Sequence, residues 1–448
     1  MQALFGEKHP KLIACAHFLY YNTSIILKAG DNSMSSYKMA EANNRVIPKE
    51  DKIFGISRKA KEMAAREGAD KVIDATIGSL LDDDGNLVIL SSVVDVLKNL
   101  TPIDFADYAP IAGTPAYLDA VKKAAFGSYV PKSYTEAVAT PGGTGAIRNT
   151  IQNYSKRGDQ VLTSDWHWSP YSTIAQEIER SITTYTLFDE EGRFNTASFE
   201  ARINELLSKQ DGLVIILNTP AHNPTGYSFT LEDWDKIIGI AKKAAGDSKK
   251  ITLLVDVAYL DYAGDEEEHR RFFPLLDDLP ANILVVVAYS LSKTCTMYGM
   301  RCGAMVCMTQ DKEISEEFKT VCSFSSRGSW SNCNRSAMTT LANIYADEAL
   351  LAKVTAERQG FCKMLVQRGK AFQAAANEIG LKIVPFHAGF FVTVPCENAE
   401  AAGLELQKEG IFTVPIGKGL RVSVASISEE KCRMLPSAML KAINKVNE

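Results

Sequence analysis

Lys293 is the residue of this 448-residue chain whose position most strongly suggests chemistry. It follows Ser290 and Ser292 in a segment that begins with an apolar run, residues 283–287. Lysines are rarely buried, and a lysine held away from water has a lowered pKa. Its neutral amine can then attack carbonyl carbons. An ordinary surface lysine in a loop explains the same residue, so the neighbouring motifs must decide between the two interpretations.

Three further segments place polar groups after an apolar run. The first, residues 140–146, contains Gly143 and Thr144 and follows the run 137–139 at the start of an expected helix. Glycines let backbone amides approach an anion, and the amino end of a helix adds a partial positive charge. A phosphate-binding loop is therefore one interpretation, and a plain turn explains these residues equally well.

The other two segments follow apolar runs that end at Leu217 and Val255. Asn223 lies in the first of them, between two prolines that make its loop rigid. Asp256 comes at the very end of the second run, and Tyr259 follows three residues later. A carboxylate at the end of a buried strand is costly unless a cation or a donor meets it. A helix cap or a structural salt bridge would also explain Asp256.

A parallel sheet would bring these four segments together. From about residue 134 to residue 308, short apolar or β-branched runs alternate with stretches of helical spacing. This alternation is typical of an α/β domain with a mostly parallel, doubly wound sheet. Continuously apolar runs indicate strands that helices cover on both faces, and ligands of such sheets bind beyond the carboxyl ends of the strands. The clearest strands are residues 161–163, 213–217, 251–255 and 283–287, and the clearest helices are residues 197–208 and 231–245.

The pattern changes after about Cys333, which predicts a second, smaller α+β domain. A long helical stretch reaches Glu378, and strand-like segments follow it. The helical stretch 57–67 is expected to pack with this domain. We therefore divide the chain into an N-terminal extension (residues 1–40), a segment that contributes to the small domain (41–95), a large cofactor-binding domain (96–332) and the small C-terminal domain (333–448).

Composition narrows the function classes. The net charge is −5 and no long cluster of Lys and Arg occurs, which argues against a nucleic-acid surface. The nine cysteines are scattered without a Cys-x-x-Cys pair, so neither a disulfide framework nor a metal site is predicted, and a reducing cytoplasm fits best. Residues 12–27 are mostly apolar, but polar residues interrupt them, so this stretch is too polar to span a membrane. We expect residues 1–40 to be loosely ordered.

Taken together, the four segments resemble the class I (fold-type I) pyridoxal-phosphate aminotransferases, especially the aspartate and aromatic amino-acid members. The resemblance covers roughly residues 70–430. It depends on the sequence AHNPTG at residues 221–226 and on serine-x-serine-lysine with Arg301 eight residues after Lys293. Thr296 and Cys302 depart from the usual lysine signature, and both are conservative in size.

The resemblance implies roles for the cofactor side of the site. Lys293 would hold pyridoxal phosphate as a Schiff base and shuttle a proton, and Asp256 would pair with the ring nitrogen. Tyr259 and Asn223 would hydrogen-bond the ring oxygen, and Asn223 would also touch the substrate. Trp168 would stack on the ring, with Trp166 as the competing choice. The phosphate would be held by Gly143, Thr144, Ser290 and Arg301.

The resemblance also implies how substrates bind. Arg421 would fork onto the α-carboxylate, and Gly78 would bring a backbone amide to the same group. Tyr108 matches a tyrosine that reaches the partner's phosphate in the family, so a homodimer with shared active sites is expected. Arg327 matches an arginine that binds a dicarboxylic side chain. The usual prolines after its motif are Cys333 and Asn334 here, and Leu80 and Leu81 replace a polar pair after Gly78, so dicarboxylic and aromatic donors both stay open.

Two alternatives to amino transfer remain. A β-lyase, including a C–S lyase, or a decarboxylase of the same fold would use the same contacts to the cofactor ring. A cofactor-binding regulator would need an attached DNA-binding domain, and the roughly seventy residues before Asp74 are too few and too poorly patterned for one. We therefore expect an aminotransferase that binds small-molecule amino acids and 2-oxo acids, and neither nucleic acid nor a membrane.

Overall fold

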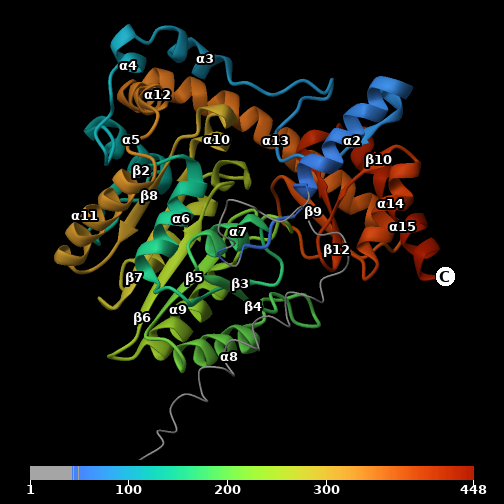
Figure 1. Ribbon diagram of the computed structural model, residues 1–448. Coiled ribbons are helices and arrows are strands. Elements are labelled where there is room, and N and C mark those ends of the chain that lie inside the picture. Colours follow the sequence, from blue (N-terminus) through green and yellow to red (C-terminus); the bar gives the residue numbers. More distant parts are fainter. Residues whose placement is uncertain (1–42, 44, 49) are drawn as a thin grey trace, which may run out of the picture. The chain divides into compact units, whose positions relative to one another are not determined.

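The apolar runs of the sequence form the strands of one large sheet. The computed structural model describes residues 43, 45–48 and 50–448, and the predicted extension of residues 1–40 lies outside them. Among the described residues, seven strands form this sheet in the order β2-β8-β7-β6-β5-β3-β4 (Figure 1). All neighbours are parallel except at β8, which is antiparallel to β2 and β7. The strands are β2 (Ala137–Thr140), β3 (Gln160–Ser164), β4 (Ser181–Tyr185), β5 (Gly212–Asn218), β6 (Lys250–Asp256), β7 (Ile283–Ser290) and β8 (Gly303–Met308).

Helices cover both faces of the large sheet, which explains why its strands are continuously apolar. Along β7, Val285 and Val287 pack into one hydrophobic cluster, whereas Val286 and Ala288 pack into another. Because side chains alternate between faces, every residue of such a strand is buried. The first cluster holds residues of α5 (Pro115–Phe126), α8 (Thr196–Leu207), α9 (Leu231–Ala245) and α12 (Arg335–Ala346), and the second holds residues of α6 (Gly142–Tyr154), α7 (Pro170–Glu177) and α11 (Lys312–Ser329).

Local signals set the ends of these helices. Thr230 caps α9 by accepting from the Asp233 amide, and the Asp233 carboxylate accepts from the Thr230 amide. This reciprocal capping box satisfies two amides that the helix leaves free. Gly246 then ends α9 in the left-handed region at φ +47°. The predicted helix 231–245 is confirmed, and the predicted helix 197–208 corresponds to α8.

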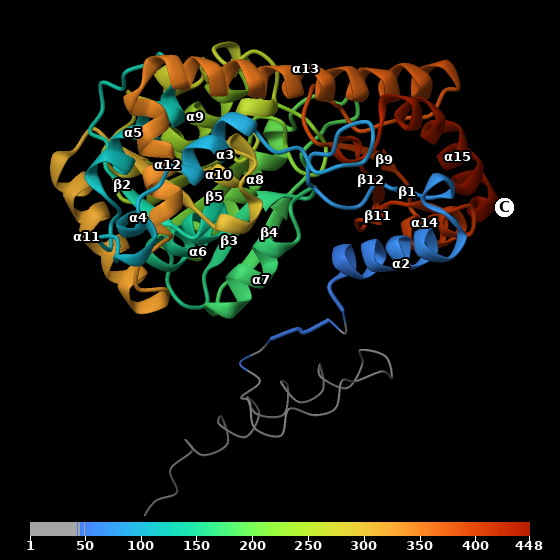
Figure 2. The same ribbon diagram turned by 90° about the horizontal axis from the view of Figure 1, so that it is seen from above.

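The C-terminal part of the chain builds a second, smaller layer. The small sheet has the order β11-β12-β9 and is antiparallel, and β1 pairs with β10 in parallel. Helix α13 runs from the helices over the large sheet to the small sheet (Figure 2). The elements are α2 (Lys52–Glu67), β1 (Ile73–Asp74), α13 (Glu348–Glu378), β9 (Phe391–Pro395), α14 (Ala399–Lys408), β10 (Ile411–Phe412), β11 (Val414–Pro415), β12 (Gly419–Ser423) and α15 (Glu429–Asn447).

One expectation needs correction. The sequence predicts a single helical stretch up to Glu378, yet the chain leaves helical geometry at Asp347 and begins α13 there. The Asp347 carboxylate accepts from the Leu350 amide, which makes Asp347 the N-cap of the second helix. A capping aspartate inside an apolar helical pattern is therefore the signal that separates α12 from α13.

The remaining elements are short, and helix α2 belongs to the smaller layer. Helix α2 packs against β1 and β10, where Ile56, Ala60 and Phe412 share a small apolar cluster. Within the described part of the chain, no helix combines the length and the apolar content that a bilayer-spanning segment needs. The other elements are η1 (Ala69–Lys71), α3 (Ser91–Lys98), α4 (Pro102–Ala106), η2 (Leu260–Tyr262), η3 (Glu268–Arg270), η4 (Phe273–Leu276), α10 (Leu291–Thr294), η5 (Tyr298–Met300) and η6 (Val424–Ser426).

Candidate active site

Lys293 lies in α10, immediately after β7, at the carboxyl edge of the large sheet. Its Nζ is 5.6 Å from the ring centroid of Tyr259 and 5.4 Å from that of Tyr298. Burial and the nearby Arg301 guanidinium lower the pKa of Lys293 to about 8, although the Asp256 carboxylate acts in the opposite direction. A neutral amine is therefore accessible near physiological pH, as nucleophilic attack on a carbonyl requires.

Asp256 is a buried carboxylate that has no ion-pair partner among the residues described. It ends β6 and is 5% exposed. Its oxygens accept from the Tyr171 hydroxyl at 2.6 Å and from the Ala258 amide at 3.2 Å. Burial raises the pKa of Asp256, and the hydrogen bonds only partly oppose this. The site is therefore prepared for a cation or a strong donor from a bound molecule.

Asn223 connects two neighbouring cavities. Its amide nitrogen Nδ2 lies 3.5 Å from the Tyr259 hydroxyl, and its Oδ1 accepts from Arg421 Nη1 at 3.3 Å. The backbone amide of Asn223 donates to Asn218 Oδ1 at 2.7 Å, which holds the loop against the end of β5. Burial raises the pKa of the Tyr259 hydroxyl, so this group stays a hydrogen-bond donor.

A cradle for an anion lies beside Lys293. Gly143 and Thr144 form the first turn of α6, whose amide groups and partial positive charge favour anions. Arg301 adopts left-handed backbone at φ +49°, and its Nη1 donates to Ser292 Oγ at 3.0 Å. A Cβ on Gly142 would lie 2.7 Å from Arg301 Nη2, so glycine at this position leaves room for the guanidinium.

These groups line one cavity of about 150 Å³, which we term the Lys293 pocket. It brings together nine residues that the sequence singles out: Gly143, Thr144, Trp168, Asn223, Asp256, Tyr259, Ser290, Lys293 and Arg301. Trp168 lines this pocket and meets Tyr171 edge to face at 5.4 Å. Trp168 also lines the neighbouring cavity. Trp166, the competing choice, lines only that cavity, where the Lys418 amine lies 4.8 Å from its ring centroid. The geometry thus favours Trp168 as the residue beside Lys293.

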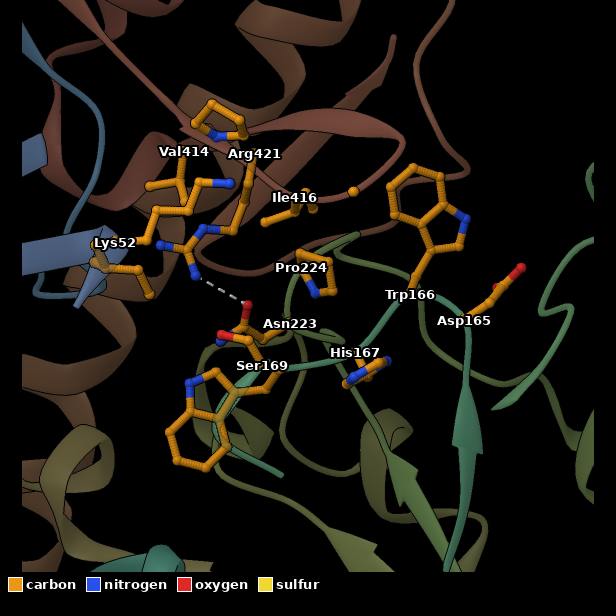
Figure 3. Close-up of a pocket in the computed structure, with 14 residues that line it drawn as sticks. Lys52, Asp165, Trp166, His167, Ser169, Asn223, Pro224, Val414, Ile416 and Arg421 are labelled. Atoms are coloured by element: carbon orange, nitrogen blue, oxygen red, sulfur yellow. Dashed lines mark hydrogen bonds between the residues drawn. The ribbon is translucent and has the colours of Figure 1, made fainter. Parts of the chain in front are cut away.

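Arg421 lines the neighbouring cavity of about 270 Å³, which we term the Arg421 pocket (Figure 3). It is 4% exposed, and its guanidinium lies 4.3 Å from the Phe391 ring centroid. Nη2 donates to the Thr76 carbonyl at 2.7 Å, and no carboxylate pairs with this arginine among the described residues. Burial lowers the pKa of Arg421 to about 10, so the group remains a cation at neutral pH. It can bind a carboxylate with two parallel hydrogen bonds.

Gly78 lies beside the Arg421 pocket rather than among the residues that line it. The preceding carbonyl groups, Thr76 and Ile77, accept from Arg421 and Ser423 of β12. A Cβ on Gly78 would lie 2.8 Å from Phe391 Cζ, so glycine permits this close packing. The segment before Gly78 and the strand of Arg421 are therefore held together, as the shared role predicted for them requires.

The structure does not bring Tyr108 or Arg327 to either pocket within one chain. Tyr108 is 82% exposed. Arg327 is exposed near the end of α11, where its Nη1 donates to Ser331 Oγ at 2.6 Å. The roles predicted for both residues therefore require a second chain and stay predictions.

Several residues around Lys293 were not predicted from the sequence. Tyr171 holds the Asp256 carboxylate, and its signal was its place three residues after Trp168. Asn218 is paired in register with Asp256, and its Nδ2 donates to the Asp256 carbonyl at 2.9 Å. Its signal was the same one that identified Asp256, a polar residue that directly follows an apolar strand. Tyr298 does not line the pocket, although its ring centroid lies 5.4 Å from Lys293 Nζ, and it carried no such signal.

Comparisons with known proteins agree with this geometry. The family model of aminotransferase class I and II matches residues 70–439. A crystal structure of an aminotransferase from Anaerococcus prevotii has 38% sequence identity and a TM-score of 0.88, covering 91% of this chain and 99% of that chain. The aromatic-amino-acid aminotransferase of Paracoccus denitrificans is 23% identical, and the aspartate aminotransferase of Escherichia coli is 25% identical. Each of these two matches covers 82% of this chain and 92% of the relative.

Pyridoxal phosphate is the cofactor of this family, and the described residues fit it. A protonated ring nitrogen would supply the cation that Asp256 lacks, and the neutral amine of Lys293 suits an aldehyde. The amino end of α6 and Arg301 suit a phosphate. By its family match, its fold and the fit of this pocket, the chain belongs to the class I and II aminotransferases and is an enzyme that depends on pyridoxal phosphate.

Proposed function

We propose that this aminotransferase uses Lys293 as its catalytic residue and takes aspartate, glutamate or aromatic amino acids as donors. The observation that carries the proposal is Asn223, which contacts Tyr259 in the Lys293 pocket and Arg421 in the Arg421 pocket. Tyr259, which would contact the cofactor, and Arg421, which would bind a substrate carboxylate, are therefore separated by the side chain of Asn223 alone. The names of the similar proteins, an aspartate and an aromatic-amino-acid aminotransferase, support aspartate and aromatic donors, and glutamate is included as the other dicarboxylic amino acid.

Residues that line the Lys293 pocket would hold the cofactor. Asp256 would accept from the ring nitrogen, Tyr259 and Asn223 would donate to the ring oxygen, and Trp168 would lie on the ring face. When bound, pyridoxal phosphate supplies an electron sink for the charge left on the substrate carbon. The phosphate would be held by Gly143, Thr144, Ser290 and Arg301.

The chain's own residues account for binding and proton transfer. Arg421 would bind the substrate α-carboxylate, with Gly78 nearby on the same side. Lys293 Nζ would take the proton from the substrate α-carbon and pass it to the cofactor carbon that carries the aldehyde in the free cofactor. Because the pKa of Lys293 is about 8, both protonation states are accessible near neutral pH, as general acid–base catalysis requires.

A homodimer would complete the site. Ile103 and Phe105 are 62% and 64% exposed, and they lie on α4 just before the exposed Tyr108. Exposed apolar side chains near one another favour a protein interface. In the dimer, Tyr108 would reach the partner's phosphate, and Arg327 would bind a dicarboxylic side chain.

We place this enzyme in the cytoplasm, which the free thiols of the described cysteines support.

The decisive experiment is the half-reaction. The purified protein should be yellow, and one equivalent of aspartate or glutamate should convert the cofactor to its amine form without release of ammonia. Lys293→Ala should lose the absorbance of the lysine-linked cofactor and lower kcat by about 10³-fold or more, since both covalent attachment and proton transfer are lost.

Lys243→Ala is the matched control, because Lys243 is exposed and pairs with Glu200 on the surface. It should keep both the absorbance and kcat. Sustained production of ammonia would instead indicate a lyase. If Lys293→Ala kept the absorbance of the wild-type protein, the assignment of the lysine would be wrong.

A further inference from the structure

Asp261 is a second buried carboxylate at this edge of the sheet, outside both pockets. It lies in η2, two residues after Tyr259, and is 3% exposed. Its Oδ2 accepts from Thr294 Oγ1 at 2.5 Å and from the Tyr289 hydroxyl at 3.4 Å. Thr294 directly follows Lys293. The Asp261 carboxylate therefore joins the segment of Asp256 and Tyr259 to the short helix that carries the lysine.

Buried cations keep Asp261 ionised. Arg270 Nη2 donates to Asp261 Oδ1 at 2.5 Å, and Arg270 is 5% exposed. Burial alone would raise the pKa of Asp261, yet Arg358 and Arg270 lower it to about 2. Arg358 in turn pairs with Glu266 at 2.7 Å, so two cations and two carboxylates balance. A balanced and hydrogen-bonded set of buried charges holds a fixed geometry.

We call the residues Asp261, Arg270, Arg358 and Glu266 the Asp261 network. This network is attached to a helix that covers the large sheet. Arg270 Nε and Nη2 donate to the Ala125 and Ala124 carbonyls at the end of α5, at 3.1 and 3.0 Å. A Cβ on Gly127 would lie 2.7 Å from Arg270 Cδ, so glycine at this left-handed position (φ +64°) lets the arginine pass. Carbonyl groups that end a helix bind cations well. Asp261 is thus fixed by an element that does not itself line the pocket.

Helix α10 needs such support because it has four residues, from Leu291 to Thr294. A helix of this length makes few internal hydrogen bonds and gains little stability from them. Its first residue is held through the Leu291 amide, which donates to the Cys302 carbonyl at 3.1 Å. At its other end, the hydroxyl of Thr294 is held by Asp261. Lys293 lies between these two attachments.

From this geometry we infer that Asp261 is a positioning residue, which acts through Thr294 to fix Lys293 relative to Asp256 and Tyr259. The inference rests on the proposed role of Lys293. Proton transfer depends steeply on the placement of the reacting groups, so a small displacement of the amine lowers kcat without weakening substrate binding. Arg421, which would bind the substrate carboxylate, has no contact with the network.

The test compares two substitutions of Thr294 in the cofactor-loaded enzyme. Thr294→Val keeps the shape of the side chain and removes the hydroxyl, whereas Thr294→Ser keeps the hydroxyl. We expect Thr294→Val to lower kcat by about 10-fold to 100-fold with KM for the donor unchanged within about twofold. It should also shift the pH midpoint of the absorbance of the lysine-linked cofactor. Thr294→Ser should retain wild-type values of both.

The pH midpoint of the absorbance distinguishes a displaced Lys293 amine from a change in the charges around it. The groups that face Lys293 are Asp256, Tyr259, Tyr298 and Arg301, and none of them changes in either variant. A shifted midpoint therefore reports a displaced amine. A merely structural role would lower the thermal midpoint and leave the midpoint of the pH titration in place.

Ser133→Ala is the matched control for stability. Ser133 Oγ donates to the Asp277 carboxylate at 2.8 Å, so the substitution also removes a buried hydroxyl–carboxylate bond, outside both pockets. It should leave kcat and the pH midpoint unchanged. The inference is wrong if Thr294→Val keeps both values, if Thr294→Ser changes them equally, or if Ser133→Ala lowers kcat as much.

Thr294→Ala serves as the second variant should Thr294→Val not fold, with the same expected and contrary results. The two proposals fail in different ways. If Lys293 is not the attachment point, Lys293→Ala keeps the absorbance. If only the positioning role is wrong, Lys293→Ala loses the absorbance while the Thr294 variants behave as the wild-type protein.

Discussion

The Lys293 pocket and the surface that carries Tyr108 and Arg327 differ in what completes them. The pocket is assembled by one chain, from residues at the carboxyl ends of parallel strands. Asn218 of β5 is in register with Asp256 of β6, which is in register with Ala288 of β7. Tyr108 and Arg327 are instead exposed, and neither lines a pocket.

The difference teaches which kinds of function one chain can establish. Strand ends converge because sheet geometry forces them to, so groups placed there meet without further information. A residue that acts across an interface meets its target only after association, and nothing in its own chain orients it. Experiments on the pocket should therefore give large, concentration-independent effects, and experiments on the surface smaller effects that depend on the partner.

The largest effect expected in the pocket concerns the reactivity of Lys293. Its pKa is lowered from 10.5 to about 8, so at pH 7 the neutral fraction is on the order of a hundredfold larger than for an ordinary lysine. Because the neutral amine is the nucleophile, the rate of pyridoxal phosphate addition to the cofactor-free protein should rise with pH and level off above about pH 8. Stopped-flow absorbance measures this rate.

Asp256→Asn sharpens this prediction, since the Asp256 carboxylate stabilises the charged lysine. Its removal should move the plateau to lower pH. A rate that rises without a plateau up to pH 10 would show that Lys293 behaves as an exposed lysine, and the contrast between pocket and surface would lose its basis.

A smaller effect is expected for Arg421→Lys. A lysine keeps the positive charge but cannot fork onto a carboxylate, so KM for every amino-acid donor should rise by about 10-fold to 100-fold. Steady-state kinetics with aspartate and with phenylalanine measure this change. Arg368→Lys is the control, because Arg368 is also fully buried and binds the carbonyls of Leu81 and Ala425 outside both pockets. Equal changes in KM for the two variants would contradict a substrate role for Arg421.

The smallest effect on KM is expected for Arg327, which lies on the surface. Arg327→Ala should raise KM for aspartate by about tenfold and leave KM for phenylalanine unchanged, because only a dicarboxylic side chain uses the second arginine. Equal losses for both donors would instead indicate a structural role at the interface.

Mixing Arg327→Ala chains with inactive Lys293→Ala chains tests whether the site is shared. Mixed dimers would pair an intact Lys293 with an intact Arg327 from the partner, so activity towards aspartate should recover. Absence of recovery after demonstrated subunit exchange would contradict the shared site.

Particular residues show how far the sequence reaches. Lys293 and Asp256 were identifiable because each follows a continuous apolar run, which must form a buried strand. Asn218 carried the same signal and was overlooked, so a stricter use of the strand-end rule would have found it. The break between α12 and α13 at Asp347 was missed because apolar periodicity continues across it, and the capping side chain is the cue that competes with it.

Other features had no local signal. The bond from Thr294 to Asp261 joins residues 33 positions apart, and neither residue follows a pattern that announces the other. The same holds for Arg421 and the Thr76 carbonyl, which lie 345 positions apart. Hydrogen bonds between distant segments depend on how complete layers pack, and packing leaves no periodicity in the sequence.

The sequence by itself determined the fold class and most of the Lys293 pocket, because apolar runs define strands and strand ends define a ligand edge. The cofactor followed from the resemblance of its motifs to a known family. Only the tertiary structure decided that Asn223 joins the two pockets, that Trp168 rather than Trp166 lies beside the lysine, and that Asp261 holds the short helix of Lys293. The physical reason is that these relations are distances between elements, which are set when buried surfaces pack against one another.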